Sequence, residues 1–251
     1  MNMPKVALFV GTPASEAVAG AGRARPLLAK DPSRDTAEFI LDVVSRPARD
    51  SGARLNLTSI YLNSEGPAAI GDSVRAIAER GVLQVHPETV ETIRQALSLK
   101  RPLAAIPETA RSRILQALHL LLHEGDHLAG APFDDAAGGT TSFGGAAARN
   151  FEEGLAELRA SQLLPDLVRS RFGLQLTAAE ANRYWGLHQG SANVALQAVS
   201  AASRNTGRAA SEIIKEFADD VPGTQRLARI EALIGDRISP IALEAQLSFQ
   251  Q

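Results

Sequence analysis

Leu120-Leu121-Leu122-His123-Glu124-Gly125-Asp126-His127-Leu128-Ala129 is the stretch that decides the fold of this chain. Its apolar run and its H-E-x-x-H pattern predict a buried helix. Successive residues of a helix turn by about 100°, so His123, Glu124 and His127 fall within an arc of roughly 100°. Two imidazoles one turn apart can share a metal ion with a carboxylate beside it, as a zinc hydrolase needs. A chance match has an expected count of roughly 0.01 or less.

The residues around this motif predict where its helix begins and ends. Pro107-Glu108 suits a first helical turn, because proline has a helical φ and Glu complements the positive end. Apolar residues recur at helical spacing over 114–122, which indicates one broad buried face. Gly130, followed by Pro132, predicts the C-terminal end. Gly125 costs up to about 1 kcal/mol relative to Ala inside a helix; a glycine there allows another backbone to approach closely.

Two histidines leave a zinc site incomplete, because a hydrolytic site usually has three protein ligands and one position for water. Downstream, Glu153-Gly154-Leu155-Ala156-Glu157 falls on a second predicted helix. Together with His123-Glu124-Gly125-Asp126-His127, this segment resembles the gluzincin metallopeptidases of the zincin superfamily. The third ligand of that group is a Glu on a later helix. The resemblance covers two short motifs, within about residues 114–160.

The resemblance implies a role for each matching residue. His123, His127 and Glu153 would bind Zn²⁺, which lowers the pKa of bound water to about 7. Glu124 would take a proton from that water and pass it to the leaving amine, as general base and then acid. Glu157 lies one helical turn after Glu153 and faces the same side. It is a candidate to accept a hydrogen bond from the ring nitrogen of a ligand histidine that faces away from the metal, which would fix the tautomer of that ring.

Structural interpretations compete with these roles. Glu153 lies three residues after Asn150 and could close a capping box, in which case Glu152 is the replacement ligand. His119 lies one turn before the first motif histidine but about 12 Å along the axis from His127. One zinc with bonds of about 2 Å cannot reach both. We therefore expect His119 to be a packed histidine or a support for the ligands.

Peptide hydrolysis also needs a group that stabilises the oxyanion. By analogy with the family, Tyr184 is the first candidate and His188 the second. The competing interpretation is that the Tyr184-Trp185 pair belongs to the core, because aromatic side chains bury large areas. His86 precedes a proline and is expected to be a turn or cap residue. Asp126 points roughly 60 to 100° away from the histidine pair and is expected to be solvated or paired with an Arg.

Composition limits the partners and the cofactor chemistry. The 251 residues are 45% hydrophobic and 4% aromatic, which favours a helical core of Ala, Leu, Ile and Val. A net charge of −2 gives no electrostatic case for nucleic acid or an anionic membrane. The chain has no Cys, which excludes thiolate ligands and a Cys nucleophile. The expected partner is a protein or peptide substrate, with the oligomeric state left open.

The remaining chain predicts mostly helices and few strands. Strands are expected at 6–10 and 54–62, with an irregular arm over 11–36. Predicted helices are 36–45, 69–80, 87–99, one from 107 to just after His127, one from 150 to about 164 or on to 172, 178–202, 209–218, 224–234 and a short one from 239. Thr177 to Glu180 forms the pattern of a capping box.

These elements predict a mainly α protein, α+β with a minimal N-terminal sheet and a zincin-like helical core. Residues 1–105 would form an N-terminal lobe and 106–251 the helical zinc-binding domain, unless the chain is one continuous domain. The loop 131–149 is interpreted either as a flap over the metal site or as a surface excursion. No apolar run reaches the length of a membrane span or signal-peptide core. Synthesis in the cytoplasm is expected, with export without a cleavable signal peptide left open.

The favoured function is a zinc-dependent metallopeptidase. Its composition and irregular N-terminal arm are compatible with a bacterial secreted effector or toxin. One alternative is a non-proteolytic DinB-like helical-bundle metalloprotein, whose third ligand would be His86 or His188. A di-iron carboxylate bundle is less favoured, because Glu124 to His127 fits Glu-x-x-His but no second copy exists. A third possibility is an interaction protein with a structural zinc or none.

Overall fold

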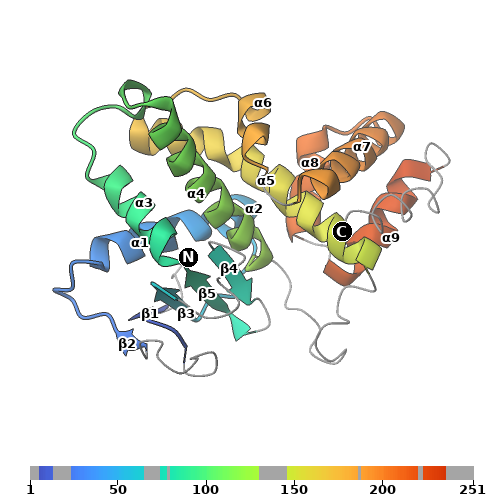
Figure 1. The fold of residues 1–251 in the computed structure, drawn as a ribbon. Helices are drawn as coiled ribbons and strands as arrows, with labels where there is room; N and C mark the ends of the chain where they lie inside the picture. The colour runs from blue at the N-terminus through green and yellow to red at the C-terminus, as the bar shows by residue number, and fades with distance from the viewer. Residues whose placement is uncertain are drawn as a thin grey trace.

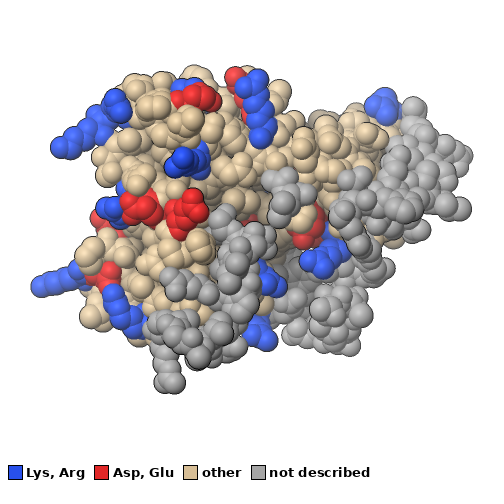
Figure 2. All heavy atoms as spheres, in the orientation of Figure 1, with Lys and Arg blue, Asp and Glu red and all other residues tan. Residues whose placement is uncertain are grey.

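The computed structural model shows a sheet with helices packed on it, followed by a group of helices further along the chain (Figure 1). It describes residues 6–13, 24–64, 74–77, 80–129, 146–185, 188–219 and 223–235. The fold is mostly helical with a mixed sheet in the N-terminal half, so the predicted α+β class is confirmed. No helix in these ranges is long and apolar enough to span a membrane. Charged side chains of both signs are scattered over the described part of one face (Figure 2).

The sheet has five strands in the order β2-β1-β3-β5-β4. Strands β1, β3 and β5 are parallel, and the two outer strands are antiparallel to their neighbours. The predicted strands at 6–10 and 54–62 are present, the second shortened to its last four residues. The strand bounds are β1 Ala7–Val10, β2 Arg25–Pro26, β3 Ser59–Leu62, β4 Val74–Ile77 and β5 Val82–Val85.

The predicted helix at 69–80 is wrong, because residues 74–77, which are most of its described part, form strand β4. Short apolar runs fit a strand and a helix equally well by periodicity. The tertiary fold decides here: β5 pairs with the central strand β3, which leaves Leu83 and Val85 fully buried. Strand β4 then pairs with β5 in an antiparallel hairpin and ends the sheet.

Helices α1, α3 and α4 pack near the sheet, and the three predictions for them are confirmed (Figure 1). Helix α4, which carries the H-E-x-x-H motif, begins after Pro107 and ends at His127, as the cap residues predict. The bounds are α1 Arg34–Val44, α2 Arg46–Ser51, α3 Pro87–Leu97, the 3-10 turn η3 Leu103–Ala105 and α4 Glu108–His127.

The C-terminal half is a group of helices built around the long helix α5. The capping box of Thr177 and Glu180 forms, with both reciprocal hydrogen bonds, but it begins only a short helix. The predicted single helix 178–202 is therefore wrong, since a 3-10 turn follows the short helix and the next helix begins at Gln189. The bounds are α5 Ala146–Phe172, α6 Ala178–Ala181, η6 Asn182–Tyr184, α7 Gln189–Thr206, α8 Ala210–Asp219 and α9 Gly223–Ile234.

Two hydrophobic clusters share helix α5. The larger joins the sheet, α1, α3 and α4 to the C-terminal half of α5, and it crosses the predicted boundary at residues 105 and 106. The smaller joins the N-terminal half of α5 to α7, α8 and α9. Most of the predicted loop 131–149 and the short helix from 239 lie outside the described residues, but 146–149 already belong to α5.

The end of α4 is fixed by main-chain contacts with the N-terminal half. The main-chain N–H of Asn56 donates a hydrogen bond to the carbonyl of Leu128 at 2.7 Å, and Leu55 forms a bridge with Ala129. A Cβ atom at Gly125 would lie 2.5 Å from the carbonyl oxygen of Val44 in α1. The close approach of another helix therefore requires a glycine at this position of the motif, in agreement with the sequence analysis.

Substituting Gly125 by Ala tests this packing. We expect Gly125→Ala to lower the free energy of unfolding by roughly 1–3 kcal/mol, because the methyl group meets main-chain atoms that cannot rotate away. The gain in helix propensity of about 1 kcal/mol works in the opposite direction. Urea unfolding of the metal-free protein measures the difference. A stability equal to or above that of the wild type would contradict the close approach.

Candidate metal centre

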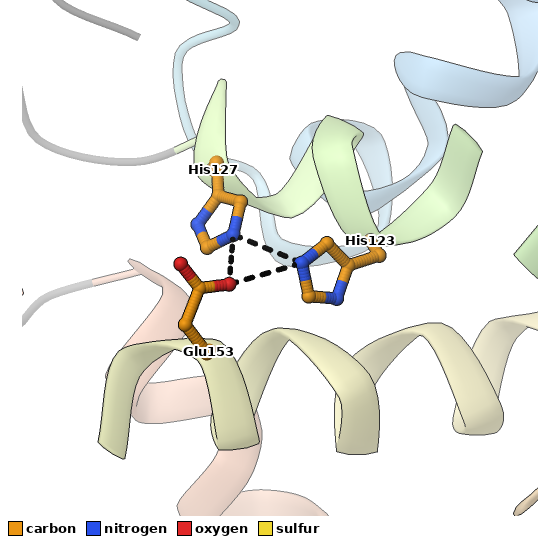
Figure 3. Close-up of side chains that lie close together, drawn as sticks. All are labelled: His123, His127 and Glu153. Atoms are coloured by element: carbon orange, nitrogen blue, oxygen red, sulfur yellow. Dashed lines mark hydrogen bonds and ion pairs between the residues drawn. The ribbon is translucent and has the colours of Figure 1, made fainter. Parts of the chain in front are cut away.

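The structure brings together the three residues predicted as metal ligands (Figure 3). His123 and His127 extend from adjacent turns of α4, and Glu153 extends from the facing α5. Oε2 of Glu153 lies 3.2 Å from Nε2 of His123 and 3.1 Å from Nε2 of His127. The two Nε2 atoms are 3.1 Å apart. One nitrogen from each ring and one carboxylate oxygen thus form a nearly equilateral triangle.

The dimensions of this triangle fit a tetrahedral metal ion. Zinc binds nitrogen and oxygen at about 2.0–2.2 Å, and two such ligands at a tetrahedral angle lie about 3.3 Å apart. The three observed separations of 3.1–3.2 Å are close to that value. In the part of the chain that the structure describes, the set contains three ligands. Three protein ligands leave one coordination position for water, as in a catalytic site.

The largely buried Glu153 carboxylate makes a cation at this point electrostatically favourable. The side chains of His123, His127 and Glu153 are 3%, 13% and 16% exposed. Burial lowers the pKa of His123 to about 4, so that its ring is neutral. For His127, burial is outweighed by the Glu153 carboxylate, which raises the pKa to about 10. The two rings in turn hold the pKa of Glu153 below its ordinary value despite burial. One positive charge is thus already drawn to this triangle.

A buried carboxylate lies behind each of the two histidines. Oε1 of Glu157 is 3.7 Å from Nδ1 of His123, and Oε1 of Glu152 is 3.9 Å from Nδ1 of His127. Glu152 also accepts a hydrogen bond from Arg226 of α9. Carboxylates in this position favour the tautomer with the proton on Nδ1, which leaves Nε2 free to bind a metal. Glu152 is thus placed as a support of His127 rather than as the replacement ligand.

Glu153 does not close a capping box with Asn150. Helix α5 already begins at Ala146, so Asn150 is an interior helical residue and the competing interpretation is wrong. The neighbouring Gly154 has a different role. A Cβ atom there would lie 2.4 Å from the carbonyl oxygen of Ser191 in α7. The E-G-x-A-E pattern thus combines ligand geometry with a close contact between two helices.

Glu124 points toward the edge of the sheet. Its Oε2 accepts a hydrogen bond from the main-chain N–H of Ala76 at 2.6 Å. Ala76 lies in β4, which ends the sheet and pairs with β5. In an antiparallel pair, residues bonded to the neighbour alternate with residues that face away. The N–H of Ala76 faces away from β5, so the carboxylate lies beside the outer edge of the sheet.

Two other polar residues of α4 are buried beside the ligands. His119 is fully buried, and burial lowers its pKa to about 3, so it is a neutral packed histidine. Asp126 is 3% exposed, which contradicts the expectation of a solvated side chain. Burial raises the pKa of Asp126, and the positive charges of Arg226 and Arg159 oppose that shift. The expected pairing with arginine is therefore electrostatic.

The two candidates for oxyanion stabilisation lie in different surroundings. The imidazole of His188 stacks on that of His123, with ring centroids 5.6 Å apart, and its Nε2 lies 3.6 Å from Oε2 of Glu153. Tyr184 packs against the larger core, and its main-chain carbonyl accepts a hydrogen bond from Gln116. His86 is the N-cap of α3 and accepts from the N–H of Glu88, as expected. His188 is thus the candidate that contacts the metal centre.

Sequence reasoning did not identify three residues that complete this region. Ala76 acts through its main chain, Ser161 binds His119, and Arg226 binds Glu152. Their side chains carry no motif, and they lie between 42 and 74 residues from the partners named. Only the tertiary fold brings them to the site.

Comparisons with family models, curated proteins and solved structures found no match to the chain.

Removing the third ligand tests the metal centre. We expect Glu153→Ala to weaken zinc binding by more than the roughly 10–100-fold that loss of an outer partner costs. The wild type should hold one zinc per chain, measured by equilibrium dialysis and metal analysis, with affinity from competition with a chromophoric chelator. His86→Ala is the matched control, because it removes a histidine that caps another helix. Wild-type affinity in Glu153→Ala would contradict the assignment.

Proposed function

We propose that this protein is a zinc-dependent metallopeptidase. The observation that carries the proposal is the convergence of His123, His127 and Glu153 on one point, with Glu124 beside the set but outside it. Two nitrogens and one carboxylate oxygen match the donors of hydrolytic zinc sites. When bound, zinc lowers the pKa of a water in its open position to about 7 and polarises the substrate carbonyl.

Glu124 is the residue to which we assign proton transfer. As general base it takes a proton from the attacking water, whose oxygen then forms a bond with the carbonyl carbon. As general acid it returns that proton to the nitrogen of the leaving amine when the C–N bond breaks. The hydrogen bond from the N–H of Ala76 holds the carboxylate at the edge of the sheet. The proton that Glu124 takes from the water is therefore the one that it gives to the leaving amine.

The outer edge of β4 is the surface that we assign to the substrate main chain. Its position beside Glu124 follows from the hydrogen bond of Ala76. Because residues alternate along the strand, the main-chain groups of Val74 face the same side as those of Ala76. An extended peptide can pair with such an edge, which fixes its carbonyl groups in one register. A sheet edge next to the general base favours a peptide as substrate.

His188 is the residue to which we assign stabilisation of the developing oxyanion. It lies at the beginning of α7, and its side chain is 39% exposed, whereas the ligand histidines are largely buried. A ring N–H directed at the site can donate a hydrogen bond to a negatively charged oxygen. Tyr184 is the less favoured candidate, because Gln116, which binds its carbonyl, lies about 10 Å along the α4 axis from His123.

The geometry gives less support to the alternative functions. A DinB-like bundle would use His86 or His188 in place of Glu153, but His86 caps α3 and His188 is not in the set whose ligand atoms lie within 4.8 Å of one another. A structural zinc site is closed by four protein ligands. The set found among the described residues has three.

Substitution of the general base tests the proposed reaction. We expect Glu124→Gln to bind zinc as the wild type does but to lose hydrolysis by about 10²–10⁴-fold, because the amide cannot accept the proton. Cleavage of fluorescently labelled casein by the zinc-loaded protein measures the rate. Glu88→Gln, an exposed position on α3, is the control. Equal activity in Glu124→Gln and the wild type would overturn the mechanism, and an inactive zinc-loaded wild type would overturn the peptidase assignment.

The hydrogen bond at the sheet edge gives a second test. Ala76→Pro removes the N–H that Glu124 accepts, while the N–H groups that face β5 stay intact, because edge strands tolerate proline at outward positions. We expect unchanged zinc affinity and a casein hydrolysis rate at least about 10-fold lower, since the carboxylate loses its position. Unchanged hydrolysis by a folded Ala76→Pro variant would show that β4 does not position the base.

A further inference from the structure

A chain of buried polar groups leads from Trp185 to the metal ligand His123. Nε1 of Trp185 donates a hydrogen bond to Oγ of Ser161 at 2.7 Å, and that Oγ lies 3.3 Å from Nε2 of His119. Nδ1 of His119 is 3.4 Å from Oε2 of Glu157. The other oxygen of Glu157 faces Nδ1 of His123 at 3.7 Å. The three middle members of this chain are at most 3% exposed.

The indole at one end of this chain and the Glu157 carboxylate near the other end together favour one direction for its protons. An indole N–H can only donate, so Ser161 accepts from Trp185 and its hydroxyl proton is free to turn to His119. The Glu157 carboxylate faces Nδ1 of His119 at 3.4 Å, an ion-pair separation, and favours the ring proton on that nitrogen, so that Nε2 accepts from Ser161. A carboxylate accepts on both oxygens, so its second oxygen favours a proton on Nδ1 of His123.

We propose that Trp185, Ser161 and His119 are positioning residues that hold Glu157 and thereby fix His123 in the tautomer whose Nε2 binds the metal. The proposal rests on the proposed zinc site, but it concerns residues that touch neither metal nor substrate. The chain begins in the segment after η6 and then passes three times between α5 and α4 before it reaches His123. Residues that support a ligand in this way determine metal affinity.

The segment that carries Trp185 also carries His188, which stacks on the ring of His123. The ligand His123 is therefore held from two directions by residues three positions apart. Trp185 acts on its Nδ1 side through the chain, and His188 covers its ring face. Ordinary core packing does not explain why two hydrogen bonds and two ion-pair contacts in succession converge on one ring nitrogen.

The test compares variants of His119 that differ only in hydrogen bonding. His119→Leu removes both the acceptor and the donor, and we expect zinc affinity to fall about 10–100-fold. His119→Gln keeps an acceptor oxygen for Ser161 and an N–H donor for Glu157, and we expect it to restore the affinity to within about threefold of the wild type. Trp185→Phe keeps the ring but removes the first donor, and a loss of about fivefold is expected.

A readout on the metal-free protein separates positioning from structural support. Long-range ¹H–¹⁵N spectra of histidine-labelled protein report which nitrogen of His123 carries the proton. We expect the Nδ1–H form in the wild type and in His119→Gln, and a mixture of tautomers in His119→Leu. His86→Ala is the control for removal of a histidine elsewhere. Thermal unfolding shows whether each metal-free variant is folded.

The outcomes distinguish this proposal from the zinc site itself. If the wild type binds no zinc, the metal assignment fails, while the tautomer of His123 still tests the chain. If His119→Leu does not fold, the comparison of Trp185→Phe with His119→Gln decides. Wild-type zinc affinity and an unchanged Nδ1–H form in Trp185→Phe, or in a folded His119→Leu, would overturn the positioning role.

Discussion

The structure depends on one electrostatic constraint, the meeting of three ligand atoms at a buried point between α4 and α5. Nε2 of His123, Nε2 of His127 and Oε2 of Glu153 lie within 3.2 Å of one another. In the metal-free protein the proton on Nε2 of His127, whose pKa is raised to about 10, can be donated to Oε2 of Glu153. Once that proton leaves, all three atoms direct lone pairs at the same space. Buried acceptors that face one another are costly, whereas a single cation at their centre satisfies all three.

Close packing of helices makes this meeting possible. Gly125 lets α4 approach the end of α1, and Gly154 lets α5 approach α7. Each glycine lies next to a glutamate of the candidate site, so the close approach of the helices and the placement of Glu124 and Glu153 are determined together. Helix α5 contributes to both hydrophobic clusters, and its carboxylates lie where the two clusters join. The site therefore lies at the junction of the two cores.

Short sequence patterns predict those parts of the fold that depend on residues close together in the chain. The bounds of α4 follow from Pro107 and from the residues after His127, and the ligand set follows from two short motifs. Strand β4 is missed because its four residues fit a helix equally well until β5 is paired with β3. The contribution of Ala76 is likewise invisible in the sequence, since it comes from a main-chain N–H whose direction depends on sheet register.

X-ray absorption spectroscopy of the zinc-loaded protein identifies the atoms that bind the metal. We expect one zinc bound by two imidazole nitrogens, one carboxylate oxygen and one water oxygen, at about 2.0–2.2 Å. The imidazole scattering should fall by half when either His123 or His127 is replaced. A zinc environment with a third imidazole, or one that is unaffected by these replacements, would contradict the account.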